Sequence, residues 1–509
     1  MHVLLVYPEY PDTFWSFRHI MPFIARKAAF PPLGLLTVAA MLPGAWEKRL
    51  VDLNVRELTD EDIAWADVVM VSAMLVQSKS ALTVIARARA AGRRVVMGGP
   101  APTAQPERFR EADHLVLGEA ETALPAFLRD FGEDGAGSPL PTYEAEGHAD
   151  IRETPLPAWE LISFRDYVSM TVQYSRGCPF DCEFCSIVQM YGRRPRVKSP
   201  EQMLREVQAL YDAGWRDGVF IVDDNFIGNK AQVKLFLARL AEWQRERRHP
   251  FCYMTEASIN LAGDEELMQL MSRANFHKVF IGIETPSEES LKECGKAQNV
   301  RVDFRSAVRA IHQHGMQVMG GFIVGFDSDT EGIFERQIRF IQEIGVVTAM
   351  VGMLNAIPGT RLWRRLKDEG RIAGDSSGDN TDGDTNVVPR MGREKLIEGY
   401  RRILATIYEP RHYYRRINTF LAGYNPTARG RIAWRDVRAF TRSAWSIGVL
   451  SRARFAYWKL MLRTALTRRR ALPVAVELAI LGQHFQRVAR AAVAGTVCAD
   501  PAHPGRARA

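Results

Sequence analysis

Three cysteines in one short stretch are the residues of this chain best suited to chemistry. The run from Ser175 to Cys185 reads SRGCPFDCEFC and supplies the thiols of Cys178, Cys182 and Cys185, with no fourth cysteine nearby. A closed iron–sulfur cluster normally takes four cysteines, and a metal site that keeps one position open is suited to catalysis. The spacing therefore predicts an iron–sulfur cluster in which the protein leaves one iron unligated.

Other uses of these cysteines need residues that the neighbourhood lacks. A zinc site would want a fourth Cys or His close by, yet the nearest histidines are His148 and His249, so a distant ligand would have to fold back. Disulfides form in oxidising compartments, and the sequence shows no secretory signal. The remaining cysteines are scattered and are expected to be ordinary thiols: Cys252, Cys294 and Cys498.

The composition suits a protein of two or three domains without a membrane span. The chain has 509 residues, of which 47% are hydrophobic and 25% are charged. No run of about 18 apolar residues occurs, and Met1–Pro8 reads as a buried strand and leaves no room for a signal peptide. We therefore expect a cytoplasmic protein, which also suits an oxygen-sensitive cluster.

Positive charge is concentrated at the end of the chain. Residues 411–509 carry 19 Lys and Arg against 3 Asp and Glu, a net of +16, whereas the whole chain carries +8. A basic region of this kind favours an anionic partner, such as lipid headgroups, nucleic acid or an acidic protein.

Residues 1–133 are predicted to form a doubly wound, Rossmann-like α/β domain. Strand-like apolar runs alternate with helical stretches, at 3–7, 49–53, 68–73, 95–98 and 114–117. Gly98 and Gly99 follow the fourth run, and Gly118 and Glu119 follow the fifth, so both turns lie at carboxyl ends of strands, where such sheets bind ligands. Tight strand-to-helix turns that bind nothing would look the same.

A second α/β domain is predicted at 166–373, after a linker at 134–165 that is rich in Gly, Pro and Glu. Its strand-like runs, at 172–174, 218–222, 251–256, 278–284, 317–324 and 348–354, predict a partial (β/α)6 barrel. The cysteines follow the first of these strands and are therefore expected at the mouth of the barrel, where barrel enzymes carry their chemistry.

Polar residues end three of the barrel strands, which makes them candidate active-site groups. Asp224 or Asn225 could instead only cap the next helix, and Glu284 could only support the turn at 285–287. The candidates are Asp223, Asp224 and Asn225 after the second strand, Glu256 and Ser258 after the third, and Glu284 after the fourth.

Residues 374–509 are predicted to be a polar loop at 374–386 followed by basic helices. Arginines and aromatic residues alternate on the predicted helices at 434–440 and 452–466. Such helices are typical of proteins that lie on a membrane surface. A packed helical subdomain with a solvated arginine face is the alternative.

The cysteine run resembles the signature of the radical S-adenosylmethionine (SAM) superfamily, Cys-x3-Cys-x2-Cys with an aromatic residue, here Phe184, before the third cysteine. The resemblance implies that the three cysteines hold a 4Fe-4S cluster, that SAM chelates its fourth iron, and that an electron donor such as flavodoxin or ferredoxin starts the cleavage of SAM to a 5′-deoxyadenosyl radical. It also makes Phe184 and the strand-end residues candidates for binding SAM.

The order of a doubly wound domain before such a barrel resembles the cobalamin-binding class of radical SAM enzymes. The likeness to this class rests on four short runs: PPLGL at 31–35, VDLN at 51–54, GGP at 98–100 and GEAE at 118–121. Three further runs are similar to the branch containing the hopanoid C-2 methylase: YGRRPR at 191–196, VDDNFIGNK at 222–230 and GGFIVGFD at 320–327. The Asp-x-His-x-x-Gly motif of many cobalamin proteins is absent. The resemblance then implies cobalamin without a histidine ligand, bound by Gly98, Gly99, Gly118, Glu119 and the loop containing Ser72, Ala73 and Met74. An empty domain is the alternative.

Together these features predict a cobalamin-dependent radical SAM methyltransferase acting on an unactivated carbon of a hopanoid-like lipid or another secondary metabolite. The basic tail would then contact the inner face of the membrane. A radical SAM enzyme that cyclises or rearranges a natural product without methylation is one alternative, and an RNA-modifying enzyme, which would use the tail on phosphates, is another. Residues 1–177 contain no cysteine, so the extra cluster of the methylthiotransferase branch is missing, and nucleic acid is not the expected partner.

Overall fold

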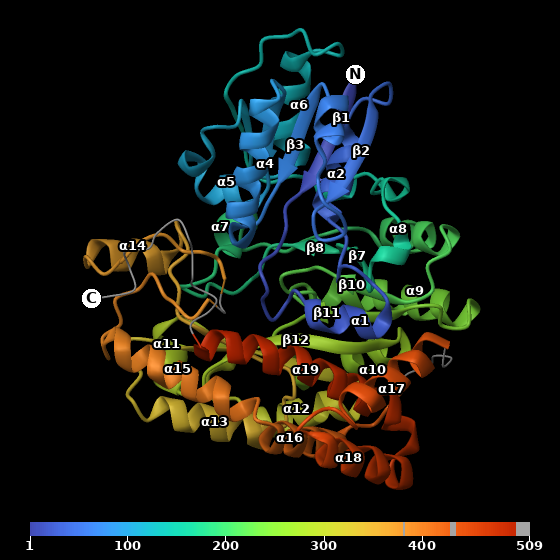
Figure 1. Cartoon of the computed structure of the whole chain (residues 1–509), viewed down its shortest axis with the longest axis vertical. Helices are drawn as coiled ribbons and strands as arrows, with labels where there is room; N and C mark the ends of the chain where they lie inside the picture. The colour runs from blue at the N-terminus through green and yellow to red at the C-terminus, as the bar shows by residue number, and fades with distance from the viewer. Residues whose placement is uncertain (380–381, 428–433, 495–509) are drawn as a thin grey trace.

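Two parallel six-stranded sheets and a set of C-terminal helices make up the computed structural model (Figure 1). The structure describes residues 1–379, 382–427 and 434–494. Cys498 and two parts of the predicted basic region, 428–433 and 495–509, lie outside the described residues.

The first sheet is doubly wound, as the sequence predicts. Its strands are β1 (His2–Tyr7), β2 (Glu47–Asp52), β3 (Val68–Ser72), β4 (Arg94–Gly98), β5 (His114–Leu117) and β6 (Thr142–Glu144), in the order β2-β1-β3-β4-β5-β6. Helices α2 (Leu33–Met41) and α6 (Ala120–Phe131) pack on one face of the sheet, while α3 (Asp60–Trp65), α4 (Ser78–Ala90) and α5 (Pro100–Ala104) pack on the other. Strand β6 lies inside the segment 134–165 that was predicted to be a linker, and its short length explains why no apolar run marks it.

The second sheet is an open barrel whose strands follow one another in chain order. They are β7 (Ser169–Val172), β10 (Gly218–Ile221), β11 (Cys252–Glu256), β12 (Phe276–Glu284), β13 (Gln317–Val324) and β14 (Ala349–Met353), with β7 and β14 at the two edges. Besides the short helix α7 (Ile187–Tyr191), the helices between them are α8 (Pro200–Asp212), α9 (Lys230–Glu246), α10 (Glu265–Arg273), α11 (Glu288–Glu293), α12 (Phe304–Gln313) and α13 (Ile333–Ile344). The first strand ends two residues earlier than predicted, because Ser175–Arg176 forms a separate strand, β8, that pairs with β9 (Arg196–Val197).

Residues Pro8–Pro32, which we call the crossing segment, leave the first sheet and run along the open side of the barrel. The backbone N–H groups of Lys27 and Ala28 donate to Asp166 O at 2.9 and 3.1 Å, and Val168 N donates to Ala28 O at 3.0 Å, so the segment pairs alongside the edge strand β7. Its short helix α1 (Met21–Ile24) contacts α17 (Trp434–Ser446) of the C-terminal region. The sequence places these residues within the first domain and gives no sign of this crossing.

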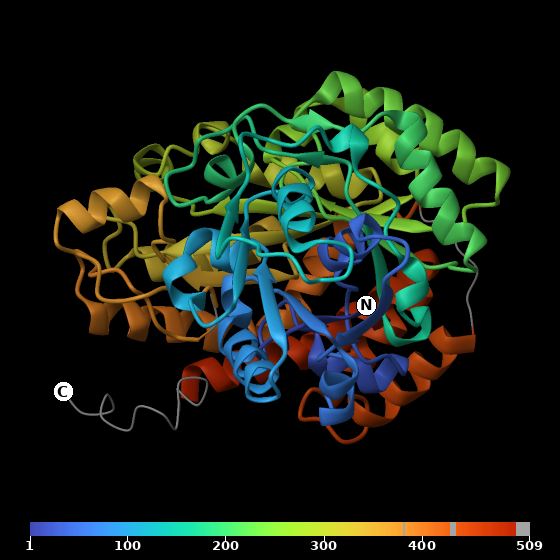
Figure 2. The same cartoon turned by 90° about the horizontal axis from the view of Figure 1, so that it is seen from above.

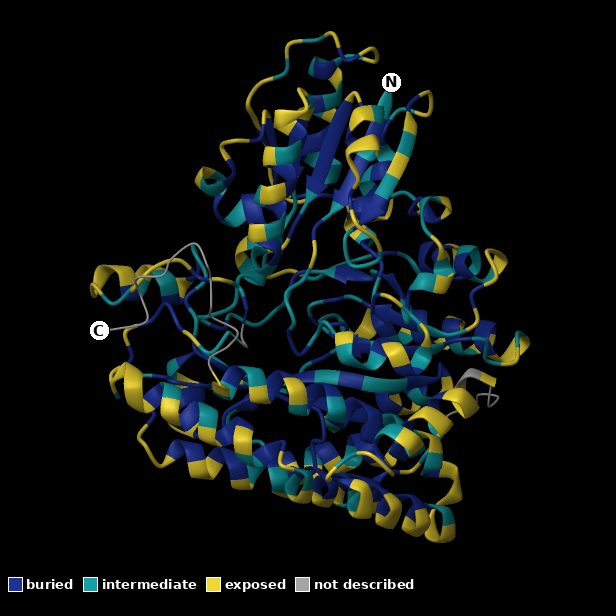
Figure 3. Cartoon of the chain, viewed as in Figure 1, coloured by how far each residue is buried: buried dark blue, intermediate teal, exposed yellow. Residues whose placement is uncertain are grey.

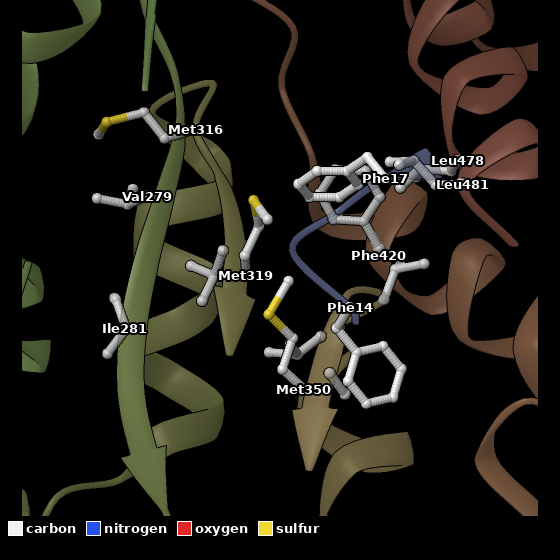
Figure 4. Packing of buried hydrophobic residues seen from close by; sticks show 14 of the residues in the cluster. Phe14, Phe17, Val279, Ile281, Met316, Met319, Met350, Phe420, Leu478 and Leu481 are labelled. Atoms are coloured by element: carbon white, nitrogen blue, oxygen red, sulfur yellow. The ribbon is translucent and has the colours of Figure 1, made fainter. Parts of the chain in front are cut away.

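Five C-terminal helices cover the other edge of the barrel: α15 (Arg393–Ile407), α16 (Pro410–Gly423), α17, α18 (Arg454–Thr467) and α19 (Leu472–Ala494). Arg416 is fully buried and donates to Ile407 O at 2.9 Å and to Val347 O at 3.2 Å, which fixes α16 beside the start of β14. Phe14 and Phe17 of the crossing segment lie near Met350 of β14 and Leu478 and Leu481 of α19 (Figure 4). The two ends of the described chain therefore share one core.

The predicted basic helices have a packed face and an exposed face. Tyr457 of α18 is buried and bonds Ser443 at 2.8 Å, so it belongs to the core and not to the outer surface. The ribbon of α17 and α18 nevertheless includes exposed positions (Figure 3). The large apolar residues exposed on these helices include Trp434, Trp445, Phe455, Leu462 and Leu466. No helix among the described residues is long and apolar enough to cross a membrane.

Candidate active site

A cavity of about 1130 Å³ lies where the carboxyl ends of the strands of both sheets meet. Seen from above, the first sheet lies over the strands of the barrel (Figure 2). Single small-molecule sites usually measure about 300–1,000 Å³, so this cavity has room for more than one bound molecule. The first domain contributes Tyr7, Ser72, Ala73, Met74, Gly99, Gly118 and Glu119 to its lining, and the barrel contributes Gln173, Arg176, Phe220, Asp223, Asp224, Glu256 and Met350.

The three cysteines lie in one loop at the barrel mouth, between β8 and the short helix α7 (Ile187–Tyr191). Cys182 is buried, and Cys178 and Cys185 are partly buried. Burial raises the pKa of the Cys182 thiol and raises that of Cys185 to about 12. A neighbouring cysteine raises each pKa further: Cys178 acts on Cys182, and Cys182 acts on Cys185. Burial therefore favours the neutral form of Cys182 and Cys185, and a cation such as iron would balance the thiolates of a metal-bound loop.

Two side-chain amides point at sulfur atoms of this loop. Asn225 Nδ2 donates to Cys178 Sγ at 3.7 Å, and Gln298 Nε2 donates to Cys182 Sγ at 3.8 Å. Asn225 lies in the loop after β10, and Ser258 Oγ donates to its Oδ1 at 3.4 Å. Hydrogen bonds to ligand sulfurs are a main control on the reduction potential of an iron–sulfur cluster.

Three carboxyl groups gather below the first sheet at the ends of β10 and β11. Asp223 is fully buried and accepts from Tyr174 N at 2.7 Å and from Ser175 Oγ at 2.6 Å. Burial raises the pKa of Asp223 to about 7 and of Asp224 to about 6; burial, with the charges of Asp224 and Asp223, raises that of Glu256 to about 8. Asp224 Oδ2 is buried without a hydrogen-bond partner among the described residues. This arrangement is suited to a cationic ligand, which would satisfy that oxygen and relieve the repulsion.

Glu284 and Phe184 point elsewhere. Glu284 ends β12 but pairs with Lys296 at 2.6 Å, and it does not line the cavity. The Phe184 ring packs against Phe326 at 6.4 Å, in an apolar cluster behind the loop that also contains Cys294. The structure thus brings Asp223, Asp224 and Glu256 to the cavity and places Asn225, Ser258, Glu284 and Phe184 around or behind the cysteine loop.

The glycine turns of the first domain are constrained by the chain itself. Gly99 has φ +93°, and a Cβ on it would meet Ser72 Oγ at 2.7 Å. Gly118 has φ +82°, and a Cβ there would meet the Ala145 Cβ at 2.7 Å. Gly98 does not line the cavity. These glycines let the strand ends pack closely, so their presence does not by itself indicate a ligand.

Glu119 connects the first domain to the cysteine loop. Its carboxylate is 2% exposed and pairs with Arg176 at 2.6 Å and with Arg196 at 2.8 Å. Arg176 also pairs with Glu121 at 2.8 Å, and it stands two residues before Cys178. Glu119 was predicted to bind a cofactor, but its oxygens are already occupied by arginines from the barrel.

Four residues at this site are not predicted from the sequence. Lys296 lies between α11 and the short 3-10 helix η8 (Ala297–Asn299), and Gln298 lies within η8, where no strand end marks either residue. Trp15 and Phe30 of the crossing segment line the cavity, and their rings lie 5.1 Å from Phe280 and 5.2 Å from Phe220. Phe30 stands directly before Pro31 in the sequence, but only the fold shows that Phe30 and Trp15 contact the barrel.

Comparisons with known proteins agree with this architecture. The B12 binding domain matches residues 23–128, the radical SAM superfamily matches 172–341, and a domain of unknown function, DUF4070, matches 360–496.

Two relatives decide the family. The chain is 42% identical to an uncharacterized methyltransferase, sll1242, of Synechocystis sp., over 90% of this chain and 86% of the relative. It is 34% identical to the hopanoid C-2 methylase of Rhodopseudomonas palustris, over 91% of this chain and 89% of that protein. The chain belongs to the cobalamin-dependent radical SAM methyltransferases. Members of this family use a 4Fe-4S cluster, SAM and cobalamin, and these are the cofactors of the present enzyme.

The solved structure of a family member has the same fold. The radical SAM methyltransferase TsrM from Kitasatospora setae, with cobalamin and a [4Fe-4S] cluster bound, aligns with a TM-score of 0.54 at 15% identity, covering 74% of this chain and 79% of that one. The residues described above fit the family's cofactors: three thiols with amide donors suit the cluster, an unpartnered carboxylate oxygen suits cationic SAM, and the strand ends of the first sheet open onto the cavity of about 1130 Å³.

Proposed function

We propose that this methyltransferase adds a methyl group to an unactivated carbon of a hopanoid-like polycyclic lipid. The observation that carries the proposal is the near full-length similarity to the hopanoid C-2 methylase. The cavity supports it, because Trp15, Phe30, Phe220 and Met350 give part of its wall an apolar character. A rigid hydrocarbon skeleton has no acidic proton, so its methylation needs the radical chemistry that SAM and cobalamin supply when bound.

The geometry supports the following assignment of residue roles. Cys178, Cys182 and Cys185 would hold the cluster, with Asn225 and Gln298 donating to their sulfurs. Asp224 and Glu256 would bind the cationic groups of SAM, while Asp223, already bonded to Tyr174 and Ser175, would fix the loop that carries them. Cobalamin would occupy the cavity beside Ser72, Ala73, Met74, Gly99 and Gly118.

The decisive experiment is a reconstituted turnover assay. Protein loaded anaerobically with iron, sulfide and cobalamin is given SAM with a deuterated methyl group, a reductant and a hopanoid, and the products are separated by mass spectrometry. We expect one labelled methyl group on the lipid. A bacteriochlorophyllide serves as a competing acceptor, because a relative 24% identical to this chain is named as a bacteriochlorophyllide d methyltransferase of Chlorobaculum tepidum. Turnover without cobalamin, or labelling of the tetrapyrrole alone, would overturn the proposal.

We also propose that α17 and α18 rest on an anionic membrane from which the lipid is taken. Trp434 and Phe455 are each 77% exposed and Leu466 is 76% exposed, and exposed basic side chains such as Arg438, Arg454 and Lys459 lie on the same helices. Each basic side chain near an anionic surface contributes about 1 kcal/mol, and apolar burial adds to it.

Substitutions test this contact better than truncation at Pro426, because truncation would remove α19 and expose the core that it shares with the crossing segment. The triple variant Trp434→Ala, Trp445→Ala, Phe455→Ala is compared with Leu235→Ser, an exposed residue of α9. We expect co-sedimentation with phosphatidylglycerol vesicles for the wild type and the control, but not for the triple variant, and a loss of binding at high salt. Equal binding by all three proteins, or a preference for RNA, would contradict the membrane contact.

A further inference from the structure

A second cluster of side chains that could bind a metal ion joins the crossing segment to α19. Asp12 and His19 come from the crossing segment, and His484 comes from α19, more than 460 positions away. One ligand atom from each of the three lies within 4.8 Å of the others. None of these three side chains lines the cavity, so they belong to none of the cofactor sites described above.

The side chains are held in the orientation that a metal ligand needs. Ser16 Oγ donates to Asp12 Oδ1 at 3.1 Å, which leaves Oδ2 facing His19. His484 Nε2 lies 3.2 Å from Phe14 O, so this nitrogen carries the proton and the ring is fixed. Backbone and side-chain partners of this kind typically orient metal-binding ligands and set the histidine tautomer.

His484 Nδ1 is the observation that points to an ion. The residue is fully buried, and Nδ1 has no hydrogen-bond partner in the described part of the chain. A buried polar atom without a partner is unfavourable, and a metal ion would supply one. The other two side chains are more open, with exposed fractions of 23% for His19 and 37% for Asp12, so water can complete the coordination.

We propose that Asp12, His19 and His484 bind a divalent transition-metal ion of the zinc class. Two imidazole nitrogens and one carboxylate oxygen suit zinc, cobalt or nickel, whereas calcium and magnesium prefer oxygen ligands alone. His19 Nε2 and Asp12 Oδ2 form a hydrogen bond of 2.6 Å. The ion would take the place of the proton in this bond, and that proton would move to Nδ1 of the His19 ring. Arg487 approaches that nitrogen at 3.5 Å, but its exposed side chain can turn into solvent.

The ion would tie the crossing segment to α19. Phe14 and Trp15 stand between Asp12 and His19 in the chain, and both line the cavity. A metal bound at Asp12, His19 and His484 would therefore fix the apolar wall of the cavity from outside, without taking part in the radical reaction.

The experiment measures zinc retention by the full chain loaded with its cluster and cobalamin. The protein is incubated with a small excess of Zn²⁺ and desalted, and zinc and iron are counted by mass spectrometry. We expect about one zinc per chain for the wild type, less than a tenth of that for His19→Ala and Asp12→Asn, and unchanged iron in all three. Zn²⁺ should also raise the melting temperature of the wild type but not of His19→Ala, because a ligand stabilises only the protein that binds it.

His412→Ala is the matched control, because His412 pairs with Glu409 at 3.3 Å with a similar exposed fraction of 27%. Asp12 and His19 are partly exposed, so their variants are expected to fold, and iron content checks this. The Cys178→Ala, Cys182→Ala, Cys185→Ala variant should still retain zinc, which separates this site from the thiols. A wild type that releases all its zinc on desalting, or equal zinc in His19→Ala and His412→Ala, would show a hydrogen-bonded tie without metal and overturn the proposal.

Discussion

Removal of Arg176 should loosen the contact between the first domain and the cysteine loop. Its side chain is 12% exposed, and its partners Glu119 and Glu121 are 2% and 11% exposed. Burial would raise the pKa of Glu121, but hydrogen bonding and charge from Arg176 outweigh burial and lower it. Breaking a buried ion pair by removing one partner destabilises by about 3–5 kcal/mol, because the other charge is left unpaired. That is about two to four powers of ten in a local opening equilibrium.

Hydrogen–deuterium exchange of the intact protein measures this opening. In Arg176→Met, amides of residues 114–122 and 173–180 should exchange faster by about that factor, because local opening governs their protection. Adding Glu121→Gln should recover part of the protection, since the unpaired charge is then gone. Arg152→Met is the control, because Arg152 makes a similar bidentate pair with Asp150 on the surface. A change below tenfold in Arg176→Met, or an equal change in Arg152→Met, would refute the reasoning.

Three further predictions concern the cavity and its cofactors. The pKa values of Asp223, Asp224 and Glu256 are raised to about 7, 6 and 8, so in the folded state these carboxyl groups keep their protons to a higher pH than in the unfolded state. The free energy of unfolding should therefore fall as the pH rises from their unfolded pKa values toward 8. Binding of cationic SAM should release protons from these groups and should be tighter at pH 8 than at pH 6, and calorimetry that shows the same affinity at both pH values would contradict this. Gln298→Leu removes a donor to Cys182 Sγ and should lower the midpoint potential of the cluster in an EPR-monitored titration, with Gln269→Leu on exposed α10 as the control. Gly99→Val should lower the melting temperature even without cobalamin, because its Cβ meets Ser72; a variant as stable as the wild type would contradict this packing constraint.

The sequence predicts the two sheets because buried parallel strands leave long apolar runs. All five predicted strands of the first domain and all six of the barrel are present within a few residues. Strand β6 has three residues, of which Tyr143 alone is buried, and therefore leaves no such run. The cysteine spacing and the acidic strand ends are local signals, so the sequence also indicates Asp223, Asp224 and Glu256, which line the cavity.

Long-range pairs are the part that the sequence does not show. Gln298 donates a hydrogen bond to Cys182, which lies 116 positions earlier in the chain. Lys296, which lies outside any helix or strand, forms an ion pair with Glu284. Glu119 looks like a ligand-binding residue because it follows a strand, yet the arginines that satisfy it lie 57 and 77 positions away. Only the packing of the two domains determines whether a polar strand end remains available to a ligand.

The crossing segment fixes the position of the first domain relative to the barrel, and these two domains form the two sides of the cavity. It leaves β1 at Tyr7, pairs with β7 near Ala28, and returns to the first sheet at α2, so it contacts the barrel between two anchors on the first domain. Separating the domains would break the bonds along β7 and the contacts of Trp15 and Phe30 with Phe280 and Phe220. The cysteine loop and the strand ends of the first sheet are therefore held at a fixed distance by the chain itself. In the proposed reaction, hydrogen abstraction and methyl delivery would take place at the same carbon, and such a reaction would depend on fixed positioning because misplacement by about 1 Å can slow a reaction about 100-fold.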